Sequence, residues 1–214
     1  MPKQSLPFES SEILMPKDSG KFIAEHSNHV KILDQTIGKL ENQLLRAFEE
    51  KKFDLKNFSE CEYHPDKNDP RTPNWLLVID ALNFSFWNDK KDEKWTFKGE
   101  SGYYALCAAI KKAVDNGVPM TDATYLSKIT RDELRHILHD PESKGEISLL
   151  EERVKNLNQA GSILLEKYNG AFAECIKICG KSAEKLLKLI INDFPSFRDE
   201  ALYNGKRGNY EQNT

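Results

Sequence analysis

The chain contains 214 residues, a length that can bury a hydrophobic core in one large domain or two small ones. Apolar residues make up 39% and charged residues 30% of the chain, and 31 basic against 34 acidic side chains leave a formal charge of −3. This balance argues against a direct nucleic-acid binder, which normally needs a basic surface, but it is compatible with a small anionic ligand held by two or three donors. The sequence has no run of about 18 apolar residues, so we expect no membrane partner.

The amino-terminal residues and the cysteines indicate a cytoplasmic protein. Residues 1–18 are polar and lack the apolar centre of a signal peptide, so we expect them to form a flexible leader. The four cysteines, Cys61, Cys107, Cys175 and Cys179, form no CxxC pair, and a zinc site would need tighter clusters with histidines nearby. We therefore expect free thiols in a reducing compartment, with no metal and no cofactor.

Helical periodicity begins at Ser19. Apolar side chains recur at three- and four-residue steps as far as Phe48, which predicts helical structure, and a break near residues 26–29 predicts that the stretch forms two helices. Residues 56–74 are dense in proline, aspartate and asparagine, so they are predicted to form a loop.

Residues 75–87 are the most apolar stretch, and periodicity alone leaves a buried strand and a buried helix equally open. In a helix, Asp80, Asn83 and Trp87 would share one face. The carboxylate and the amide could then read the edge of a flat heterocycle while aromatic rings, Phe84 among them, stack on it. The alternative is a core helix whose polar side chains cap neighbouring segments, because burying such groups is costly unless they are hydrogen-bonded. Composition favours neither interpretation.

A short hairpin and a helix follow. Residues 95–97 alternate as a strand, and glycines on either side of the next turn predict a hairpin. The apolar positions of residues 103–116 predict a helix that ends at a glycine. Gly102 could let backbone approach a ligand, and the paired Tyr103 and Tyr104 could stack on it or donate to it. The alternative, a plain turn that enters a helix, is favoured on these residues alone.

The remaining segments also read as helices. Thr130 and Glu133 form a capping box, and Ser182 is a predicted cap. The last three helices are predicted at residues 147–168, 171–179 and 183–193. The five histidines complete no metal triad, and Arg153 with the acidic pair before it is interpreted as a solvated helix face. The chain is thus predicted to be mainly α, with at least six helices and at most one small β-hairpin.

Seven short segments occur together in a characteristic order. They are residues 19–27 (SGKFIAEHS), 74–87 (NWLLVIDALNFSFW), 101–109 (SGYYALCAA), 117–121 (GVPMT), 149–153 (LLEER), 161–168 (GSILLEKY) and 194–199 (FPSFRD). Each is weak alone, but in this order and spacing they resemble the queuosine-salvage family of queuosine 5′-phosphate N-glycosylases. The resemblance runs from about residue 19 to residue 207.

The resemblance implies a fold similar to the helical DNA glycosylases, and therefore a helix over residues 75–87. It implies that the partner is a small molecule, queuosine 5′-phosphate or the base queuine, which is released by hydrolysis of the N-glycosidic bond and returns to tRNA modification. The predicted base-contacting residues are Phe84, Trp87, Tyr103 and Tyr104, with Asp80 and Asn83 reading the polar edge. Hydrolysis also needs a carboxylate to stabilise positive charge on the sugar and to activate water, and a cation to hold the phosphate.

The resemblance stops near Arg207. Residues 19–207 are expected to correspond to the amino-terminal part of the family's chain, and residues 208–214 to be a divergent tail. The family continues with a lysine- and arginine-rich helix, where the hydrolytic residues are expected. Within this chain only Asp199 is a candidate acid, against the alternative of a surface or capping aspartate. Weak or no turnover is therefore expected, and the alternative function is a non-catalytic queuine-binding or scaffold protein. The sequence predicts no oligomeric state.

Overall fold

The computed structural model describes residue 14 and residues 16–53, 56–87 and 93–209. These residues form two compact units. One comprises the described residues up to Glu50 together with those from Arg198 onward, and the other runs from Lys51 to Phe197. The predicted span 19–207 includes parts of both units. Most of the predicted leader and residues 210–214 of the predicted tail lie outside the described residues.

The first unit consists of two helices and a hairpin: α1 (Pro16–His26), α2 (Asp34–Glu49), β3 (Glu200–Tyr203) and β4 (Lys206–Asn209). The predicted break into two helices near residue 26 is confirmed. The turn between the strands is Asn204-Gly205, with φ +46° and +76°, the dipeptide and conformation that favour a tight hairpin. Tyr203 packs edge-on against Phe22 of α1, which holds the hairpin on that helix.

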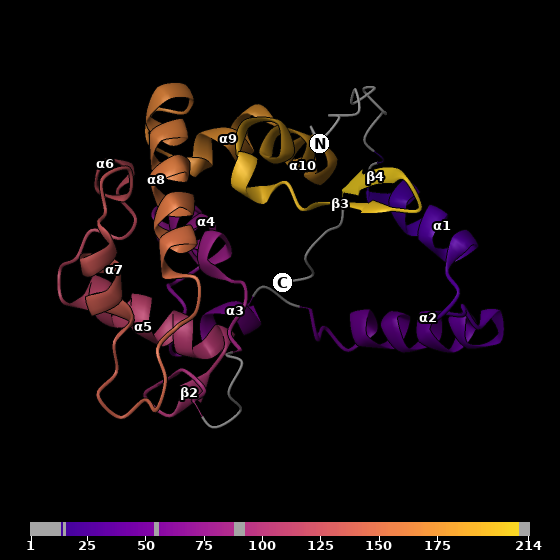
Figure 1. The fold of residues 1–214 in the computed structure, drawn as a ribbon, viewed down its shortest axis with the longest axis horizontal. Helices are drawn as coiled ribbons and strands as arrows, with labels where there is room; N and C mark the ends of the chain where they lie inside the picture. The colour runs from indigo at the N-terminus through magenta and orange to yellow at the C-terminus, as the bar shows by residue number, and fades with distance from the viewer. Residues whose placement is uncertain (1–13, 15, 54–55, 88–92, 210–214) are drawn as a thin grey trace, which may run out of the picture. The chain divides into compact units, whose positions relative to one another are not determined.

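The second unit is built from helices and one small hairpin (Figure 1). Its elements are α3 (Lys56–Glu60), α4 (Thr72–Leu82), β1 (Thr96–Phe97), β2 (Glu100–Ser101), α5 (Tyr103–Asp115), α6 (Ala123–Leu126), α7 (Arg131–Leu138), α8 (Leu150–Lys167), α9 (Phe172–Ile178), α10 (Ala183–Asp193) and a 3-10 turn, η1 (Pro195–Phe197). The predicted mainly-α class is confirmed. The hairpin predicted after residue 95 is present, and the hairpin β3–β4 of the first unit was not predicted.

Helix α4 lies at the centre of the second unit, in contact with α5, α8 and α9. Val78, Ile79 and Leu82 belong to one buried cluster, and Leu77 to another that includes side chains from α8 and α9. A helix buried on several sides has no polar face to reveal its period. This is why periodicity alone left the segment undecided between helix and strand.

The predicted helix over residues 75–87 is correct as far as Leu82 and wrong beyond it. The chain then bends, and Ser85 takes the left-handed value φ +46°. The reason is Arg153 of α8, whose buried guanidinium donates to the carbonyl oxygens of Leu82 and of two residues in the bend. Without these donors, the carbonyl oxygens would need the N–H groups of a further helical turn as partners. Trp87 therefore lies beyond the helix and does not share the predicted face.

The hairpin β1–β2 leads directly into α5. Gly102, at φ +61°, makes the junction, and α5 ends where Gly117 turns the chain at φ +83°, as predicted. Trp95 is buried before β1, and its indole Nε1 donates to the Leu138 carbonyl at 2.9 Å. The hairpin is thereby held on the end of α7.

Helix α8 packs along α4, α6 and α7 (Figure 1). The capping box at the start of α7 is confirmed, because the Thr130 hydroxyl accepts from the Glu133 amide at 3.3 Å and the Glu133 carboxylate accepts from the Thr130 amide at 2.8 Å. Ser182 caps α10 by accepting from the Lys185 amide at 3.3 Å. The three predicted carboxyl-terminal helices are all present.

One further prediction needs correction. Residues 56–74 were expected to form a loop, but α3 occupies the start of this segment and α4 begins at Thr72. Pro73 stands in the first turn of α4, where a proline is compatible with a helix because the missing N–H would have no helical partner. Among the described residues, no helix has the length and apolar character needed to cross a bilayer.

Candidate functional site

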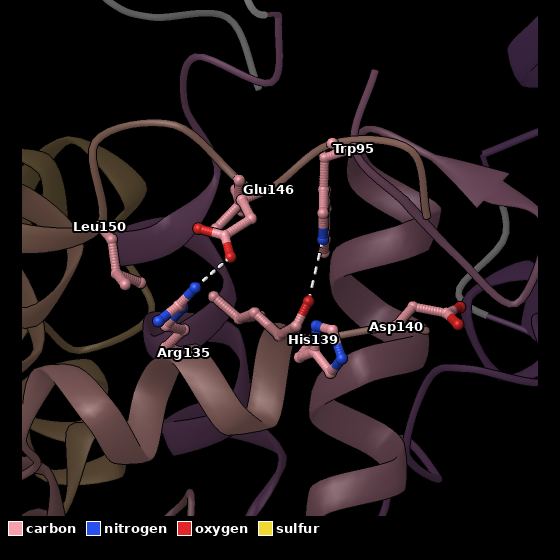
Figure 2. A pocket seen from close by; sticks show the side chains of 9 residues that line it. Trp95, Arg135, His139, Asp140, Glu146 and Leu150 are labelled. Carbon is pink, nitrogen blue, oxygen red and sulfur yellow. Dashed lines mark hydrogen bonds and ion pairs between the residues drawn. The ribbon is translucent and has the colours of Figure 1, made fainter. Parts of the chain in front are cut away.

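A partly open pocket beside the β1–β2 hairpin is too small for a heterocycle (Figure 2). It lies between Trp95, the end of α7 and the segment before α8, and Arg135 and Glu146 form an ion pair at its side. Its volume of about 20 Å³ is room for one water molecule. None of the predicted site residues lines it, so it is not the predicted base pocket.

Asp80 occupies the carboxyl-terminal part of α4. Its side chain is accessible to solvent, yet the surrounding protein atoms reduce its hydration and raise the pKa of the carboxyl to about 6. Within the described part of the chain it forms no ion pair and no side-chain hydrogen bond. A reachable carboxyl group that is poorly hydrated and unpartnered is available to a ligand.

The first turn of α5 brings two predicted tyrosines next to this carboxyl group. Asp80 lies close enough to Tyr103 for its charge to raise the pKa of the phenol, although burial is the larger cause. Tyr103 is half-buried, and the exposed ring of Tyr104 packs edge-on against it at a centroid distance of 5.5 Å. Asp80 and the two tyrosines therefore belong to one neighbourhood on α4 and α5, and their predicted contact with a base stays a prediction.

Two residues behind Tyr103 were missed by sequence reasoning. His64, in the loop after α3, is 3.0 Å through Nε2 from the Tyr103 hydroxyl. Cys107, one turn further along α5, is buried, and burial raises the pKa of its thiol to about 12, so it remains protonated. The sequence carried no signal for His64, because a lone histidine in a proline- and aspartate-rich loop has no periodicity that could relate it to α5.

The bend after α4 carries the other predicted residues, which differ in their exposure and in their contacts. Asn83 is half-buried, and its side-chain amide forms no hydrogen bond with another described residue. Phe84 is half-buried, and the guanidinium carbon of Arg153 lies 4.3 Å from the centre of its ring. Trp87 is 77% exposed. Asn83 and Trp87 are thus open to a ligand, whereas the Phe84 ring already has a cation stacked on it.

Arg153 organises this bend and corrects the interpretation of its helix face. The guanidinium is fully buried, Nε donates to the Ser148 carbonyl at 2.9 Å, and the other nitrogens donate to the carbonyls of the bend. Burial lowers its pKa to about 10, so it remains charged at neutral pH. Its donors are occupied by carbonyl oxygens, which makes it a poor candidate for holding a phosphate. A signal was present, because Arg153 lies four residues before Leu157, in register with the apolar stripe of α8.

The cysteines and Asp199 complete the account of predicted residues. All four cysteines are free thiols; three are buried and Cys61 is half-buried. No group of three or more potential metal-ligating side chains occurs among the described residues. Asp199 lies just before β3 in the first unit, and its catalytic role stays a prediction.

The geometry of α4, α5 and the intervening bend therefore offers, within one unit, aromatic rings together with a carboxyl group and an amide that have no hydrogen-bond partner among the described residues. Comparison with known proteins shows the family to which the chain belongs. The pattern of the family described as "Queuosine salvage protein" matches residues 63–209. This chain belongs to the queuosine salvage protein family. The match includes Asp80, the bend and both tyrosines, as well as His64 and Arg153.

Several relatives carry the name queuosine 5′-phosphate N-glycosylase/hydrolase. The protein of Nematostella vectensis is 38% identical over 195 residues, which cover 89% of this chain and 56% of the relative. That of Bos taurus is 40% identical over 200 residues, covering 91% and 58%. That of Sphaerobacter thermophilus is 43% identical over 138 residues, covering 63% and 41%. The chain thus spans less than three-fifths of the length of each of these relatives.

Proposed function

We propose that this chain binds queuosine 5′-phosphate and serves hydrolysis of its N-glycosidic bond, the reaction that releases queuine for reuse in tRNA modification. The observation that carries the proposal is membership of the queuosine salvage family, together with relatives named for this substrate. Four free cysteines are in keeping with a reducing cytoplasmic location. A binding partner that is a small nucleotide also agrees with the net charge of −3.

The open groups around α4 suit the base of this substrate. Queuine is a 7-deazaguanine, a flat ring whose polar edge carries N–H donors and a carbonyl acceptor. In the proposed complex the Asp80 carboxylate accepts from the N–H donors, and the Asn83 amide supplies a donor and an acceptor beside it. The exposed rings of Tyr104 and Trp87 provide faces for stacking.

The Asp80 carboxyl can also gain or lose a proton as charge develops on the base. A carboxyl whose pKa lies near 6 exists in both protonation states close to neutral pH. A 7-deazapurine has carbon at position 7 and cannot be protonated there as a purine can. Departure of the base must therefore be assisted at another edge, and a carboxyl group at that edge can give or take a proton as charge develops.

The experiment measures binding and release separately. Purified chain is titrated with queuine by calorimetry and incubated with queuosine 5′-phosphate, and free queuine is quantified by mass spectrometry. Asp80→Asn should weaken queuine binding at least tenfold, because an amide offers a donor where the ligand also presents donors. Asp132→Asn is the matched control, since Asp132 is 93% exposed on α7 and should have no effect.

The outcomes are distinct. Binding with release supports the full proposal. Binding without release supports the alternative function of a non-catalytic queuine-binding protein. Absence of both, in a chain that melts cooperatively, overturns the assignment of the site to this substrate.

A further inference from the structure

His64 is held from both sides of its ring. Nδ1 lies 2.9 Å from the Phe58 carbonyl oxygen, and Nε2 lies 3.0 Å from the Tyr103 hydroxyl. The imidazole also contacts three aromatic rings, those of Phe58, Trp75 and Tyr103, at centroid distances of 4.5, 5.4 and 5.7 Å. Both nitrogens are therefore committed, and packing fixes the orientation of the ring.

These two hydrogen bonds determine which nitrogen carries the proton. A carbonyl oxygen has only lone pairs, so Nδ1 must donate to Phe58. Burial lowers the pKa of His64, which keeps the imidazole neutral at pH 7, and a neutral imidazole has a single N–H. Nε2 consequently has a lone pair, and the Tyr103 hydroxyl must donate its hydrogen to it.

The consequence concerns Tyr103 rather than His64. With its hydrogen committed to His64, the Tyr103 oxygen presents lone pairs to anything else that approaches. The Cys107 sulfur is a second acceptor within reach of the Tyr103 hydroxyl, but sulfur is a weak acceptor, and the imidazole nitrogen at 3.0 Å takes the hydrogen in preference to it. Asp80, whose charge reaches Tyr103, is an acceptor when ionised. Two acceptors thus stand in one neighbourhood.

We propose that His64 is a positioning residue that makes Tyr103 an obligate hydrogen-bond acceptor, so that the site selects a base whose edge carries N–H donors. Guanine-type edges have a ring N–H next to an exocyclic amine, whereas a base that lacks the amine leaves one acceptor unpaired. This inference rests on the proposed function and adds the group that sets its base selectivity.

The first test needs no ligand and no substitution. Nitrogen-15 NMR of the histidine side chains at pH 7 reports which ring nitrogen of His64 is protonated, and the His64→Gln spectrum assigns the signal by its loss. A protonated Nδ1 with a bare Nε2 is expected. A proton on Nε2, or an imidazolium, overturns the inference.

The second test measures selectivity with two probes, 7-deazaguanine and 7-deazahypoxanthine, which differ only in the exocyclic amine. The wild-type chain should prefer 7-deazaguanine about tenfold, the effect of one unpaired acceptor. His64→Phe keeps an aromatic ring but frees the Tyr103 hydrogen, so the preference should fall to twofold or less. His64→Gln should retain it, because its amide oxygen can accept from Tyr103.

The Tyr103→Phe background separates this role from a structural one. There, His64→Phe should change selectivity no further, since the oxygen on which His64 acts is gone. If the preference of the wild-type chain is absent, or if His64→Phe lowers it equally in both backgrounds, the inference is wrong while the proposed function stands. If neither probe binds the wild-type chain, the proposed function fails and the inference fails with it.

Discussion

Helices α6 and α8 approach each other closely at Gly161 of α8. A Cβ placed there would stand 2.5 Å from the Ser127 amide nitrogen, 2.7 Å from the Ala123 carbonyl oxygen and 2.9 Å from the Leu126 carbonyl carbon. All three atoms belong to the backbone of α6 and its end, so no side-chain rotation relieves the contact. Gly161→Ala must therefore push α6 away from α8.

The magnitude follows from opposing contributions. Forcing a methyl group into a close-packed interface costs about 1–3 kcal/mol. Moving α6 also strains two hydrogen bonds from the Asn158 amide to the carbonyls of Leu126 and Ile129, at 2.9 and 3.1 Å, each worth about 0.5–1.5 kcal/mol. Alanine stabilises the helix by about 1 kcal/mol relative to glycine, because its helix propensity is higher. We expect a net loss of about 2–4 kcal/mol in the free energy of unfolding.

Urea denaturation followed by circular dichroism at 222 nm measures this loss. Gly38→Ala is the matched control, because Gly38 also lies inside a helix but has nothing within 4 Å of a Cβ. It should be neutral or stabilise its helix by up to about 1 kcal/mol. Equal stability of Gly161→Ala and the wild type would refute the close approach of α6 and α8.

Three further predictions use the same second unit. Asn74→Ala should destabilise it by about 2–3 kcal/mol in urea, because the amide donates to the carbonyls of Thr121 and Gly170 and accepts from the Phe172 amide, and all three groups would lose their partner; a loss below 0.5 kcal/mol, on the order of a surface substitution, would contradict this. Arg153→Met should lower the free energy of unfolding by about 3–5 kcal/mol, because it leaves buried carbonyls unsatisfied. Arg153→Lys should recover only part of this loss, since lysine lacks the guanidinium fork. Full stability of the methionine variant would show that the fork is dispensable. Poor hydration raises the folded-state pKa of Asp80 from 3.8 to about 6, so the wild type loses the stability contributed by the protonated carboxyl as pH rises from about 4 to 6. Asp80→Asn has no such loss, so its melting temperature should rise relative to that of the wild type over this interval. Melting temperatures that change in parallel would contradict the raised pKa.

The sequence by itself determined the elements whose signals are local. The capping box at Thr130, the cap at Ser182 and the glycine that ends α5 all depend on residues within one turn, and the structure confirms each. Amphipathic periodicity likewise located α8, because a helix packed on one side keeps a polar face. The combination of short segments also pointed to the queuosine salvage family, which the comparisons confirm.

Only the tertiary structure decided where α4 ends and which residues stand behind the tyrosines. The bend after Leu82 is imposed by Arg153, which lies 71 residues away in sequence, and no local rule can anticipate donors that arrive from another helix. His64 reaches Tyr103 across 39 residues for the same reason. Hydrogen bonds between distant segments are products of folding, since their partners become neighbours only when the helices pack, and at this site such bonds set both the backbone and the polarity of the side chains.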